Sequence, residues 1–127
     1  METFSRALQT LAVFLSAVTA GLLLTTPSGH SLHSAAAYTV FVVAVVQVVA
    51  AVLAWKPGGD SPWPIGYAGV FLVLVTAQVV LGIAHVTAVH VPLGVLLFGL
   101  SLSRLSACLP LPGRSRRPGR RASRAAV

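Results

Sequence analysis

The chain has 127 residues and a formal net charge of +7, yet 56% of its residues are hydrophobic and only 9% are charged. A soluble domain carries about 25% charged residues, so this composition excludes a water-facing surface over most of the chain. It equally excludes intrinsic disorder of the main body, which requires low hydrophobicity and high charge. The sequence therefore predicts one all-α domain of an integral membrane protein.

Four apolar stretches are long enough to cross a bilayer, which takes about 20 residues in a helix. They predict helices over about 7–26, 31–55, 65–84 and 89–109. Pro27-Ser28-Gly29, the breaker cluster 56–62 and a turn around 85–89 separate them. Because all three connections are short, neighbouring helices should pack antiparallel. We expect an up-down-up-down four-helix transmembrane bundle spanning residues 1–109.

The first stretch also admits a second interpretation. Arg6, an apolar run and Val18-Thr19-Ala20 before Gly21 resemble a signal-peptidase site. The apolar run continues to Leu24 and reaches the length of a span, which favours a retained helix. Cleavage stays open as the alternative.

Basic residues are confined to one side of the predicted bundle. Six of the nine lie in the tail 110–127, namely Arg114, Arg116, Arg117, Arg120, Arg121 and Arg124, and Arg6, Lys56 and Arg104 fall on the same side. The positive-inside rule then places both termini in the cytoplasm, for a multi-pass protein of the plasma (inner) membrane. The Gly-, Pro- and Arg-rich tail is expected to be disordered and to touch anionic lipid headgroups rather than nucleic acid, because no nucleic-acid-binding module accompanies it.

All four histidines, His30, His33, His85 and His90, are expected near the outer face. Ionisable residues at membrane depth are functional candidates. Since the second and fourth helices run in the same direction, His33 and His90 should lie at one depth and face each other across the core. Two neutral imidazoles can hold haem iron from opposite faces, which predicts one b-type haem (heme b) on His33 and His90. His30 and His85 are expected to orient the cofactor, meet its propionates or face water.

Small residues accompany this histidine pair, and two interpretations stay open for them: space for a flat ring, or ordinary close packing of membrane helices. They lie on one face of the second helix (Ala37, Val40, Ala44, Gln47, Ala51) and of the fourth (Gly94, Leu97, Ser101). Gln47 and Gln78 are expected deeper in the membrane, hydrogen-bonded across the bundle.

The stretch from His85-Val86-Thr87-Ala88-Val89-His90 to Gly99 resembles an uncharacterised actinobacterial family of four-helix integral membrane proteins, and its pattern is similar to one half of haem A synthase. In that family each half carries haem-ligating histidines at the outer ends of its second and fourth helices; the matching positions are His33 and His90. The family's first half has a glutamate where this chain has His30, and the only acids here are Glu2 and Asp60. The resemblance therefore implies a haem-binding or electron-transferring half-unit, alone or as a homodimer, and not oxidation of a haem methyl group.

Other functions remain as alternatives. A non-enzymatic accessory or structural subunit of a larger membrane complex, without a cofactor, would need none of the histidines. Proton-coupled export would need a carboxylate within the membrane, and the predicted helices contain none. A zinc site made of the four histidines would be unusual, because no acidic residue accompanies them. The sequence holds no Ser-His-Asp set, phosphate loop or carboxylate pair, which argues against an enzyme. The single Cys108 is interpreted as a small apolar filler.

Overall fold

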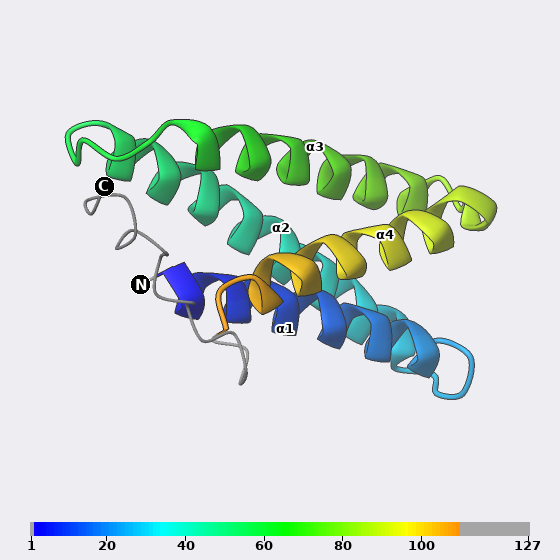
Figure 1. Ribbon diagram of the computed structural model, residues 1–127. Coiled ribbons are helices and arrows are strands. Elements are labelled where there is room, and N and C mark those ends of the chain that lie inside the picture. Colours follow the sequence, from blue (N-terminus) through cyan, green and yellow to red (C-terminus); the bar gives the residue numbers. More distant parts are fainter. Residues whose placement is uncertain (1, 110–127) are drawn as a thin grey trace, which may run out of the picture.

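The computed structural model describes residues 2–109, and that part of the chain is all-helical with no strand. It comprises α1 (Glu2–Leu22), α2 (Gly29–Trp55), α3 (Trp63–Ile83) and α4 (Thr87–Ser106), shown in Figure 1. All four helices are long and apolar enough to cross a membrane. The tail 110–127, with its predicted disorder and lipid contact, lies outside the described residues.

The helix ends differ from the apolar stretches because caps and breakers, rather than hydropathy, set them. α1 ends at Leu22 instead of 26, and a turn over residues 23–25 leads from there to Pro27. α3 begins at Trp63 instead of 65, with Pro64 in its first turn, where a missing N–H costs nothing. α4 begins at Thr87 and ends at Ser106, before the expected residue 109.

The helices form a four-membered ring of neighbours. α1 packs against α2 and α4, and α3 packs against the same two helices, whereas α1 with α3 and α2 with α4 are diagonal pairs. Consecutive helices run antiparallel (Figure 1), so the start of α1 and the end of α4 share one end of the bundle. We call this the terminal end, and the opposite end, with the connections 23–28 and 84–86, the histidine end.

The core is a narrow column of side chains contributed by all four helices. Its buried members are Ala12, Val13, Val40, Ala44, Phe71, Val75 and Leu97. Ala44, only 1% exposed, and the buried Ser101 allow close approach in the middle of the bundle. Most other large apolar side chains point outward on every helix, an arrangement that suits hydrocarbon rather than water.

Two side-chain hydrogen bonds join neighbouring helices toward the terminal end. Gln47 Nε2 on α2 donates to the Ser5 carbonyl of α1 at 3.0 Å. The Tyr67 hydroxyl on α3 donates to the Leu100 carbonyl of α4 at 3.4 Å. Gln47 thus bonds to a backbone carbonyl of the adjacent helix, and not to Gln78 as the sequence had suggested.

Candidate histidine site

His33 and His90 meet across the centre of the bundle. Each lies about one turn into its helix, His33 on α2 and His90 on α4, and these helices are diagonal and run in the same direction. The two ring centres are 6.2 Å apart, with ring planes inclined by 77°. Both side chains are half-buried. The equal depth expected from the sequence thus becomes a direct pairing of imidazoles.

The ring of His33 is oriented by α1. Its Nδ1 lies 3.0 Å from the Ser16 carbonyl oxygen and 3.4 Å from the Thr19 hydroxyl. Because a carbonyl oxygen can only accept, Nδ1 carries the proton and donates it. In the neutral ring, Nε2 then bears a lone pair, and within residues 2–109 it has no hydrogen-bond partner.

His90 has the same arrangement on the neighbouring helix pair. Its Nδ1 donates to the Gln78 carbonyl of α3 at 2.9 Å. The ring lies flat enough against α3 that a Cβ added at Gly82 would be 3.0 Å from its Cε1. Gly82 is therefore the position that lets the imidazole approach the α3 backbone. In its neutral form this ring, too, carries its lone pair on Nε2.

Gln78 contributes to the site through its side chain as well. Its Nε2 would lie 3.0 Å from a Cβ at Gly94, so the amide packs over the α4 backbone one turn below His90. Its Oε1 is buried and has no partner among the described residues. One unused acceptor therefore lies on the Gln78 amide that packs against Gly94, one turn from His90.

His30 and His85 do not join this pair. Both are exposed, His30 in the first turn of α2 and His85 in the α3–α4 connection. Across residues 2–109 no group of three or more His, Cys, Asp or Glu side chains is arranged to hold a metal ion. The alternative of a four-histidine zinc set is therefore not assembled in this part of the chain.

The histidine pair supplies two ligands of the type that proteins offer to haem iron, and fewer than a bare metal ion usually takes. Metal–imidazole bonds are about 2 Å long, so two imidazoles on opposite sides of one metal have ring centres about 6 Å apart. Metal-bound histidines usually donate their other N–H to a carbonyl or carboxylate, as both rings do here to backbone carbonyls. Two ligands leave a metal ion otherwise uncoordinated, whereas a porphyrin supplies the remaining nitrogens.

The sequence left two roles open for the small residues beside the histidines: space for a flat ring, or close packing of helices. Ala44, Leu97 and Ser101 are buried in the packed column below the site and serve close packing. Gly82 and Gly94 lie directly against His90 and Gln78 and shape the site itself.

Sequence reasoning missed the groups that orient the imidazoles. They are the backbone carbonyls of Ser16 and Gln78, and carbonyl positions leave no residue signature. Gly82 carried a usable signal, because it lies four residues after Gln78 on the same face of α3.

No protein-family model, no curated protein and no solved structure matches this chain.

Proposed function

We propose that this chain is a small membrane protein that binds one b-type haem between α2 and α4, at the histidine end, for electron transfer. The observation that carries the proposal is the His33–His90 pair, 6.2 Å apart across the bundle with each Nδ1 on a backbone carbonyl. The resemblance to one half of haem A synthase points to the same two positions.

The chain's own groups would hold and tune the cofactor. His33 and His90 would offer their Nε2 atoms to the iron, and the Ser16 and Gln78 carbonyls hold the rings in place. The column beginning at Val75 and Leu97 closes the bundle below and confines a ligand to the histidine end. One-electron exchange at iron is the chemistry that such a group supplies when bound.

A cofactor-free accessory subunit is the second candidate, and one observation favours it. The hydrogen bond of His33 joins α2 to α1, and that of His90 joins α4 to α3. The two histidines therefore also stabilise the two helical hairpins. In this interpretation the histidines stabilise the bundle, and the protein acts by packing against other membrane proteins.

The orientation proposed for the bundle follows from charge. Arg6, Lys56 and Arg104 lie toward the terminal end, and the connections 23–28 and 84–86 contain no Lys or Arg. By the positive-inside rule the terminal end faces the cytoplasm of a bacterial plasma membrane and the histidine site faces outward.

The proposal is tested by visible spectra of detergent-purified protein, oxidised and dithionite-reduced, after expression with haem supplied. We expect a Soret band and a sharp reduced α band in the wild type, both lost in His33→Ala and His90→Ala. Gly82→Ala should push the His90 ring by a few tenths of an ångström and weaken haem affinity about tenfold. Gly99→Ala, whose added Cβ meets nothing within 4 Å, is the matched control.

The same variants separate the two candidates. A colourless wild type that takes up no haem on reconstitution would contradict haem binding. If His33→Ala and His90→Ala then lower the thermal stability, the histidines stabilise the packing of the helices, as the accessory-subunit candidate requires.

A further inference from the structure

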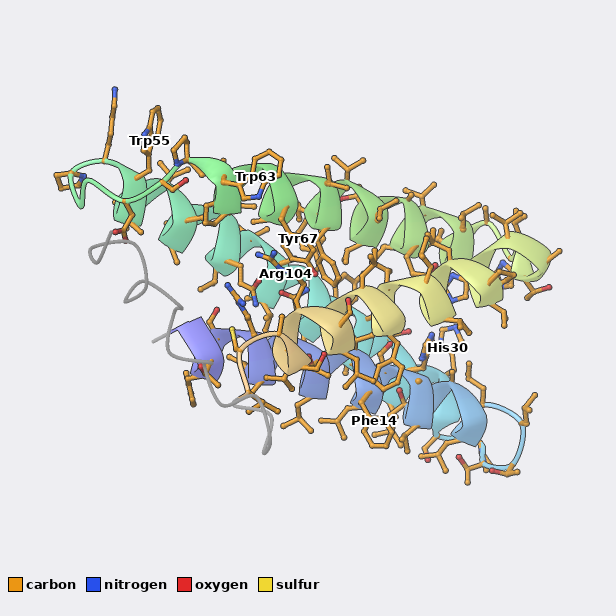
Figure 2. All side chains as sticks on the ribbon, viewed as in Figure 1. Phe14, His30, Trp55, Trp63, Tyr67 and Arg104 are labelled. Carbon is orange, nitrogen blue, oxygen red and sulfur yellow. The ribbon has the colours of Figure 1, made fainter. Side chains whose placement is uncertain are left out.

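The terminal end of the bundle holds a second polar cluster, contributed by three helices. The guanidinium carbon of Arg104 on α4 lies 4.3 Å from the ring centre of Tyr67 on α3. Both side chains are labelled in Figure 2. Arg6 on α1 donates from Nη1 to the Arg104 carbonyl at 3.4 Å and contacts the Cys108 sulfur. Gln9, one turn along α1 from Arg6, lies within hydrogen-bonding reach of the Tyr67 hydroxyl, and both arginines are charged neighbours of the same hydroxyl.

Two N–H donors of this cluster are buried without acceptors. Gln9 is only 3% exposed, and its Nε2 has no partner within residues 2–109. Nε of Arg104 is likewise buried with no acceptor in that part of the chain. An unsatisfied buried donor is strongly unfavourable, more so when it belongs to a charged group, so native structures rarely keep one without a ligand or water.

Few acceptors lie near the buried donors of Gln9 and Arg104. Guanidinium groups offer five N–H donors and no acceptor. The two buried hydroxyls nearby are engaged with their own helices, Thr10 donating to the Arg6 carbonyl and Ser101 to the Phe98 carbonyl, each at 2.9 Å. The only acids of the sequence are Glu2 and Asp60, and among the side chains that the structure describes, residues 3–109, Arg104 forms no ion pair.

We propose that Gln9, Tyr67 and Arg104 form a binding site for a phosphate group at the terminal end. The Nε–Nη edge of a guanidinium matches two oxygens of a phosphate, and the Gln9 amide supplies a further donor from the neighbouring helix α1. Stacking on Tyr67 fixes the plane of the Arg104 group. A phosphate would thereby satisfy both buried donors and offset the positive charge.

A phospholipid headgroup and free phosphate present the same chemistry to this site. The terminal end lies at headgroup depth if the chain spans the bilayer as proposed above, and in that case lipid phosphate is the nearest source. The site is at the opposite end from His33 and His90, so failure of haem binding would leave it untouched.

The test measures the thermal midpoint of full-length protein in dodecyl maltoside, washed free of phospholipid and held in chloride buffer. The probes are dioleoylphosphatidylglycerol, dioleoylglycerol with the same tails and no phosphate, and inorganic phosphate at matched ionic strength. The variants are Arg104→Gln and Gln9→Leu. Lys56→Gln is the control, since Lys56 is a cation stacked at 4.6 Å on Trp55 outside the cluster.

We expect saturating phosphatidylglycerol to raise the midpoint by about 5 °C in the wild type and Lys56→Gln, with no rise from dioleoylglycerol. The rise should fall below about 1 °C in Arg104→Gln and Gln9→Leu. The same pattern with inorganic phosphate would identify a soluble phosphate compound as the ligand class. Without phosphate, Gln9→Leu should be at least as stable as the wild type, because it removes an unsatisfied donor. This variant alone is enough for the test if Arg104→Gln does not fold.

Two results would overturn the proposal. One is a wild-type midpoint that neither phosphatidylglycerol nor phosphate raises. The other is a rise in both cluster variants as large as in Lys56→Gln, which would show that only general surface charge attracts the lipid.

Discussion

His85 adopts a backbone conformation that is unusual for a residue with a side chain. It follows the last turn of α3 with φ of 56°, in the left-handed region that ends many helices. Non-glycine residues enter this region at a cost of about 1–2 kcal/mol. Its side chain is exposed and has no hydrogen bond with the described residues, so its part in turning the chain from α3 to α4 is conformational.

Replacing His85 with glycine should therefore stabilise the protein. Relief of the left-handed strain outweighs the greater chain entropy of glycine, and we expect the free energy of unfolding to rise by about 0.5–1 kcal/mol. Thermal unfolding followed by circular dichroism measures the change. His85→Val serves as the opposite substitution and should destabilise, while haem content should stay at the wild-type level in His85→Gly. Loss of haem from that variant would show that the His85 side chain contributes to the site.

At the scale of elements, the α1–α2 hairpin depends on one close approach. Gly29, the first residue of α2, is buried, and an added Cβ would collide with the Leu22 carbonyl and the Leu23 Cα. These are backbone atoms and cannot rotate away, unlike a side chain. The contact sets where α2 begins, and therefore the register that aligns His33 with the Ser16 carbonyl.

Gly29→Ala should separate the two helices at this turn and lower the free energy of unfolding by about 1–3 kcal/mol. Thermal unfolding in detergent measures the loss. Gly21→Ala is the matched control on the α1 side, since its Cβ would meet nothing within 4 Å, and it should be neutral or slightly stabilising. Equal stability of the two variants would contradict the close approach.

For the whole molecule, the ring of four helices separates two chemistries at opposite ends. Imidazoles without a nearby formal charge gather at one end, and arginines with Tyr67 and Gln9 gather at the other. Between them lies the apolar column of Phe71 and Val75. A bilayer provides the matching environment, with hydrocarbon around the middle and water and headgroups at both ends.

The proposed orientation predicts which connections reagents can reach. In a Cys108→Ser background, Thr25→Cys should react with a membrane-impermeant maleimide on intact cells, whereas Ser61→Cys should react only after permeabilisation. Thr25 and Ser61 are both exposed and lie in connections at opposite ends of the bundle. Labelling in permeabilised cells controls for intrinsic reactivity. The reverse pattern would mean that the histidine end faces the cytoplasm.

The amino-acid sequence alone determined the number and type of elements. Long apolar runs leave helices as the only way to satisfy backbone groups in hydrocarbon, and Pro27 and the 56–62 cluster break them where the chain turns. The parallel direction of α2 and α4, and hence the equal depth of His33 and His90, also follows from short connections.

Only the tertiary structure decided which side chains meet. Hydropathy does not say which helices are diagonal, and that arrangement brings the two imidazoles within 6.2 Å. The same arrangement directs Gln47 to the Ser5 carbonyl instead of Gln78. The oriented Nδ1 atoms and the buried donors of Gln9 and Arg104 depend on backbone carbonyls and burial, which arise from packing and leave no pattern in the order of residues.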